Sequence, residues 1–63
     1  MTIKFTELNR TGQIVLGTYE TDNRVLAYEC RSPTEDGKTD IFRNQSLETV
    51  AKVYWQKVAD LSL

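Results

Sequence analysis

Three strand-forming runs joined by very short turns are the feature that most constrains the fold of this chain. The runs cover residues 2–8, 13–20 and 24–31, and they alternate in polarity or are rich in β-branched and aromatic residues. Turns at residues 9–12 and 21–23 separate them. Parallel strands need crossovers of a dozen or more residues, so connections this short require antiparallel pairing. The sequence therefore predicts an antiparallel β-meander.

A fourth strand is the open point of this prediction. Residues 32–38 form the one substantial loop, which holds the only proline and an Asp36-Gly37 turn signal. Residues 39–43 follow, with Ile41 and Phe42 at their centre. They form either a short returning strand or an extension of the loop, so the expected sheet has three or four strands.

The chain ends in a predicted amphipathic helix. Ser46 or Asn44 suits the N-cap, and Glu48 favours the first turn of a helix. The apolar stripe at helical spacing consists of Leu47, Val50, Ala51, Tyr54, Trp55, Val58 and Leu61. We expect one α+β domain over residues 1–63, a three- or four-stranded antiparallel meander followed by one C-terminal helix packed on one sheet face.

The residue inventory excludes most kinds of active site. The chain has one cysteine, Cys30, and no histidine, which removes an internal disulfide, a zinc site and histidine-assisted nucleophilic catalysis. The carboxylate pairs Glu35–Asp36 and Glu20–Asp22 fall in turns, where solvated side chains are expected. We therefore expect no enzyme, no cofactor and no metal. The chain also lacks a membrane-length apolar run and a secretory signal pattern, so a cytoplasmic protein is expected.

The predicted sheet carries apolar residues on both faces, although one helix covers only one of them. The expected core face consists of Ile3, Phe5, Ile14, Leu16, Leu26 and Tyr28, with Ile41 as a further candidate. The second face carries Val15, Gly17, Tyr19, Val25, Ala27 and the candidate Phe42, beside Lys4, Thr6, Glu29 and Arg31. An apolar patch of this kind marks a contact surface. The alternative is a shift in register, because a one-residue slip exchanges the two faces.

The second face predicts a protein-docking surface. The candidate interface residues are Val15, Tyr19, Val25, Ala27, Phe42 and Trp55. Tyr19 and Phe42 are the expected anchors, since aromatic residues are enriched at interface hot spots. For Trp55, an aromatic plug that seals the core is favoured over a role in recognition.

A nucleic-acid interface is the alternative to a protein interface. Three strands followed by a helix that opens Ser46-Leu47-Glu48, with a Gly37-Lys38 turn before the last strand, resemble in outline the N-terminal DNA-binding domains of phage-type integrases and plant AP2 domains. That resemblance implies a sheet that reads the major groove. The residues available for it are Lys4, Arg10, Arg24, Arg31, Lys38 and Arg43. The net charge of −1 and the interspersed acidic residues argue against this role.

These observations favour a small non-enzymatic protein-binding module that occupies a surface of a larger protein. Short acidic proteins of this build are common among bacteriophage and mobile-element products, where they act as accessory or inhibitor proteins. A homodimer is compatible with this hypothesis. A DNA-binding accessory protein that uses its sheet is the alternative function, and no membrane partner is expected.

Overall fold

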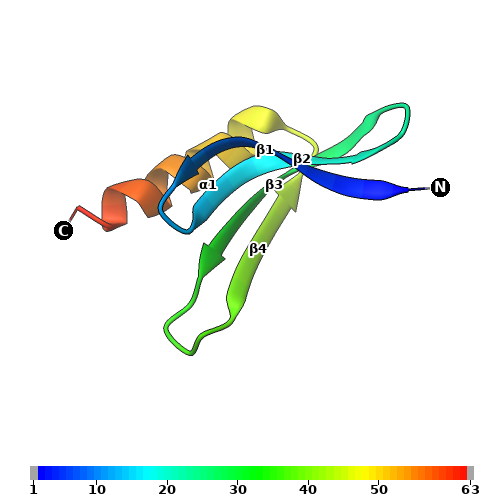
Figure 1. Cartoon of the computed structure of the whole chain (residues 1–63). Coiled ribbons are helices and arrows are strands. Elements are labelled where there is room, and N and C mark those ends of the chain that lie inside the picture. The colour runs from blue at the N-terminus through cyan, green and yellow to red at the C-terminus, as the bar shows by residue number, and fades with distance from the viewer. Residues whose placement is uncertain (1, 63) are drawn as a thin grey trace.

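The structure is a computed structural model that describes residues 2–62, and it is a four-stranded sheet followed by one helix (Figure 1). The elements are β1 (Ile3–Thr11), β2 (Ile14–Thr21), β3 (Val25–Pro33), β4 (Thr39–Asn44) and α1 (Leu47–Asp60). The strands pair antiparallel in the order β1-β2-β3-β4, and α1 packs on β2, β3 and β4. The predicted fold class is confirmed, and the fourth strand forms.

The first hairpin is tighter than the sequence predicted. β1 continues to Thr11, which pairs with Ile14, so the turn consists of Gly12 and Gln13 alone. Gly12 adopts a φ of 59°, a left-handed conformation that glycine takes without a steric penalty. The predicted turn at residues 9–12 is therefore wrong for residues 9–11, which are part of the strand.

A β-bulge at Leu8 decides which face each half of β1 presents. The pairing runs from Thr11–Ile14 to Asn9–Leu16, and then resumes one residue out of step at Glu7–Gly17. Because side chains alternate with a period of two, one extra residue exchanges the faces of everything before it. Phe5 consequently pairs with Tyr19, on the face opposite to the core. The prediction that Ile3 and Phe5 lie on the core face is wrong for this reason.

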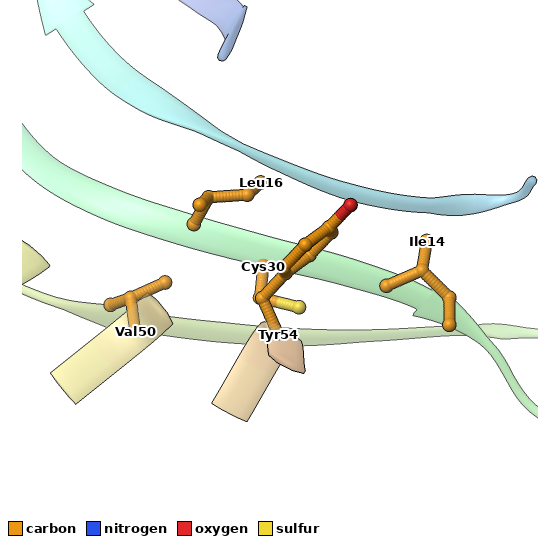
Figure 2. Close-up of a cluster of buried hydrophobic side chains, with 5 residues drawn as sticks. All are labelled: Ile14, Leu16, Cys30, Val50 and Tyr54. Carbon is orange, nitrogen blue, oxygen red and sulfur yellow. The ribbon is translucent and has the colours of Figure 1, made fainter. Parts of the chain in front are cut away.

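The core lies between α1 and one face of the sheet. It consists of Ile14, Leu16, Cys30, Val50 and Tyr54, with Tyr28, Phe42, Ala51, Val53 and Val58 packed against it. Figure 2 shows the Tyr54 side chain extending from α1 toward the sheet, flanked by Ile14 and Leu16. Burial raises the pKa of the Cys30 thiol, as expected for a small apolar core residue.

The register of β4 is the opposite of the expected one. Phe42 pairs with Cys30 and packs against the core, whereas Ile41 pairs with Arg31 on the other face. The predictions that Phe42 faces outward and Ile41 inward are therefore both wrong. The connection over residues 34–38 sets this register, because it places Thr39 opposite Pro33.

Both predicted capping residues act at the start of α1. The Ser46 hydroxyl accepts a hydrogen bond from the Thr49 backbone N–H at 3.3 Å, as an N-cap does. The Asn44 side-chain oxygen accepts one from the Ser46 N–H at 2.8 Å. The backbone N–H groups of Ser46 and Thr49 are thus hydrogen-bonded where the chain passes from β4 into α1.

The Tyr54 hydroxyl ties α1 to the far strand of the sheet. It hydrogen-bonds the Thr11 hydroxyl at 2.7 Å, while the Tyr54 ring is fully buried. We expect Tyr54→Phe to lower the free energy of unfolding by about 1 kcal/mol, measured by urea denaturation. In a double-mutant cycle with Thr11→Val, the two losses should be strongly non-additive. Full additivity would show that the bond contributes nothing.

Candidate functional site: the open face of the sheet

The sheet face opposite to α1, here called the open face, carries three central rows of side chains between the pairs Ile3–Thr21 and Pro33–Thr39 at its two ends. Directly opposed residues of antiparallel strands point to the same face, so the pairing defines each row. The rows are Phe5–Tyr19–Ala27, Glu7–Gly17–Glu29–Arg43 and Arg10–Val15–Arg31–Ile41. The open face therefore combines two aromatic rings, three arginines and two glutamates.

Glu29 is the centre of this face. Its side chain is 0% exposed, although α1 covers the opposite side of the sheet. Arg31 and Arg43 each donate a hydrogen bond from Nε to one of its two carboxylate oxygens. Because a buried carboxylate is tolerated only when it is paired and hydrogen-bonded, the two arginines are what allow Glu29 to be buried here.

Each of these arginines also lies over an aromatic ring. The guanidinium carbon of Arg31 is 3.8 Å from the centre of the Phe5 ring, and that of Arg43 is 4.5 Å from the centre of the Tyr19 ring. Cation–π contacts of this kind hold a guanidinium in a fixed plane. The hydrogen bond and the charge of Glu29 raise the pKa of Arg43 above its ordinary value.

Gly17 makes room for this arrangement. A Cβ atom at Gly17 would lie 2.6 Å from Cζ of Phe5, and closer still to the backbone carbonyl of Thr6. The Phe5 ring therefore lies directly over the Gly17 backbone, which is what brings a β1 side chain within reach of Arg31 on β3. Glycine is required at this position because another residue approaches the backbone closely.

A shallow hollow of about 420 Å³ lies at one end of the open face. Its lining consists of Phe5, Glu7, Arg10, Gln13, Val15, Arg31 and Thr39. Arg10 is fixed at its edge, since Nε and Nη2 both lie 2.9 Å from Oε1 of Glu7, and Nη1 donates to the Gly12 carbonyl at 3.2 Å. The hollow combines an apolar floor with charged and polar groups at the rim.

The predicted interface residues divide between four places. Val15, Tyr19 and Ala27 lie on the open face as expected. Val25 does not, because a second bulge after Tyr19 pairs it with Glu20 instead. Phe42 lies in the core, and Trp55 is 55% exposed on α1, where its ring meets Tyr54 edge-on. Trp55 therefore does not plug the core.

The predicted basic residues divide in a similar way. Arg10, Arg31 and Arg43 are brought together on the open face. Arg24 and Lys38 lie in the two turns that flank β3. Lys4 lies on the core side of the sheet, 3.8 Å from Glu20, because the Leu8 bulge reverses the start of β1.

Sequence reasoning placed Glu29 correctly but missed its role, and it missed Phe5 altogether as an open-face residue. Glu29 and Arg31 stand two positions apart in one strand, which places them on the same face. That spacing is a signal for a pair. Nothing in the sequence indicated the bulge that brings Phe5 beside them.

Glu20 forms a small polar cluster on the core side of the sheet. The hydroxyls of Thr6 and Thr18 donate to its carboxylate at 2.7 and 3.3 Å. The Thr6 bond is the main cause of a lowered pKa for Glu20, with Thr18 and Lys4 acting in the same direction. Asp36 has a lowered pKa as well, since the Thr34 hydroxyl donates to it in the β3–β4 turn.

Residues 2–62 contain neither a candidate metal site nor a membrane-spanning helix. No group of three or more histidine, cysteine, aspartate or glutamate side chains in this range could hold a metal ion. No helix in the same range is long and apolar enough to cross a membrane.

Comparison with known proteins gives no relative. No protein-family model, no curated protein and no solved structure matches the chain.

Gly17→Ala tests the packing of Phe5 on the backbone. We expect a loss of about 3 kcal/mol in the free energy of unfolding, because the new methyl group must displace the Phe5 ring or the β1 backbone. Gly12→Ala is the matched control. Its Cβ would meet nothing within 4 Å, so it should cost only the left-handed strain of about 1 kcal/mol. Equal losses in urea denaturation would contradict the close-approach explanation.

Glu20→Gln tests the polar cluster through pH. The lowered pKa means that the Glu20 carboxylate stabilises the fold above its unfolded value of 4.5 and loses this effect as the pH falls through the lower folded value. We expect the variant to be less stable than the parent at neutral pH, with the difference shrinking below about pH 4.5. Thermal melts across pH measure this, with Glu35→Gln in the exposed turn as the control. Parallel curves for parent and Glu20→Gln would refute it.

Proposed function

We propose that this protein is a small non-enzymatic binding module that docks on another protein through the open face of its sheet. The observation that supports this proposal is the buried carboxylate of Glu29 between two arginines that rest on Phe5 and Tyr19. Arginine and aromatic residues are the types enriched at protein interfaces. Side chains that are already fixed also lose less conformational entropy on binding.

The charge of the open face favours a protein over a nucleic acid as partner. Its rows contain three arginines and two glutamates, which leaves one positive charge in excess. Nucleic-acid affinity depends on several phosphates being neutralised by uncompensated cations. On this face Arg31 and Arg43 pair with Glu29, and Arg10 pairs with Glu7. Few uncompensated cations therefore remain to neutralise phosphates.

A DNA-binding accessory protein is the second candidate function. One observation favours it: the fold gathers Arg10, Arg31 and Arg43 on the side of the sheet that no helix covers. A sheet can enter the major groove with such a face. The two candidates differ in salt dependence, which is steep for phosphate contacts and shallow for a largely neutral interface.

The proposed role is that of an accessory or inhibitor protein in the cytoplasm, of the kind that phages and mobile elements encode. Cys30 is a free, buried thiol, which suits a reducing compartment. A module of this size acts by covering a surface of its partner rather than by chemistry on a substrate.

Affinity capture with matched variants tests the docking face. The tagged protein is incubated with lysate of the cells that encode it, with and without nuclease. Tyr19→Ala and Arg43→Ala each remove one half of an open-face stack, and Lys52→Ala on the exposed side of α1 is the control. We expect a stoichiometric protein that survives nuclease, is retained by Lys52→Ala and is reduced at least tenfold by both open-face variants.

Two outcomes would contradict the proposal. Capture that is unchanged in both open-face variants would exclude this face as the docking surface. Capture of nucleic acid with a steep salt dependence would favour the second candidate. Circular dichroism of each variant establishes that the fold is retained.

A further inference from the structure

We propose that the hollow beside Arg31 is a binding site for a carboxylate, supplied as an aspartate or glutamate side chain of the partner. This inference rests on the proposed docking function and specifies the chemistry of the group that enters the face. The site consists of Arg31, Gln13 and Thr39 around a floor of Phe5 and Val15, with Arg10 and Glu7 at the edge.

Unused hydrogen-bond donors point to an anion. Arg31 has five N–H donors, and the recorded bond to Glu29 uses the one on Nε. Within residues 2–62, its Nη atoms and the side chains of Gln13 and Thr39 form no hydrogen bond. A guanidinium edge with two parallel donors matches a carboxylate in a bidentate arrangement.

The charge of the face points to a monovalent group. The excess of one positive charge on the open face is neutralised by one carboxylate. A phosphate dianion would leave the site negative, close to the carboxylate of Glu7. The small positive excess that disfavours nucleic acid as a partner therefore favours a single acidic side chain.

The floor of the hollow strengthens such a contact. Val15 is 7% exposed, and the Phe5 ring lies under the Arg31 guanidinium. The methylene groups of a glutamate can pack on this apolar floor while its carboxylate reaches the rim. The hollow is open and about 420 Å³ in volume, which suits an inserted side chain.

NMR titration of the full-length protein tests this site. The probe is the capped peptide acetyl-Ala-Glu-Ala-amide, and acetyl-Ala-Gln-Ala-amide is the neutral control. We expect saturable shifts of the Gln13 side-chain amide, the Arg31 side-chain N–H groups and the Thr39 backbone amide, with millimolar affinity, and no saturation with the control. No saturable shift up to about 50 mM glutamate peptide, a binding free energy of only about −2 kcal/mol, would overturn the inference.

A matched pair of substitutions gives the second readout. Gln13→Glu adds a negative charge at the rim and should weaken peptide binding at least tenfold. Gln56→Glu makes the same change on the outer side of α1 and should leave binding unchanged. Equal effects of the two variants would overturn the site. Inorganic phosphate that binds as tightly as the glutamate peptide would overturn the preference for a carboxylate.

The capture experiment separates this inference from the docking proposal. If Arg43→Ala abolishes capture and Gln13→Glu does not, the open face is the docking surface but the hollow is not its carboxylate site. If neither variant reduces capture, the docking proposal itself fails. Loss of capture in both supports the two together.

Discussion

The charge of Glu29 is the constraint on which the open face depends. A carboxylate taken out of water costs several kcal/mol unless opposite charge and hydrogen bonds compensate it. Glu29 is fully buried on a face that lacks a helix, so its neighbours must provide both the cover and the compensation. Arg31 and Arg43 provide the charge, and their guanidinium planes complete the cover by resting on Phe5 and Tyr19. A layer of side chains thus does for this face what α1 does for the other.

Backbone geometry is what makes this layer possible. The bulge at Leu8 turns Phe5 to the open face, and the missing side chain of Gly17 lets the ring lie against the backbone. Without the bulge, Phe5 would point to the core side and Arg31 would lose its contact with the Phe5 ring. Bulges commonly redirect side chains next to functional sites, and here the Leu8 bulge places Phe5 and Glu7 on the open face. The result is a face of fixed cations and aromatic rings, which is suited to recognition.

The core on the other side of the sheet is small. The buried cluster is limited to Ile14, Leu16, Cys30, Val50 and Tyr54 with their half-buried neighbours. Domains of this size bury only about 60% of their unfolded surface, so their stability is small. The Tyr54–Thr11 bond and the caps at Ser46 and Asn44 therefore matter more than they would in a larger protein. Partner binding would add to stability by mass action.

The sequence by itself determined the architecture. Short turns required an antiparallel meander, and the helical stripe with its caps predicted α1. Alternation grouped the side chains of β2 by face correctly, but the bulge opposite Tyr19 separated Val25 from Ala27 in β3. The absence of histidine and the single cysteine narrowed the kinds of active site and metal site to be expected. Only the tertiary structure decided which face of each strand lies on the core side of the sheet and which lies on the open face. The Leu8 bulge, the bulge after Tyr19 and the β3–β4 connection each shift the pairing, and these shifts moved Phe5, Val25, Ile41 and Phe42 to faces opposite to the expected ones. The physical reason is that strand periodicity is local, whereas register depends on backbone pairing between strands, and a single extra residue reverses it.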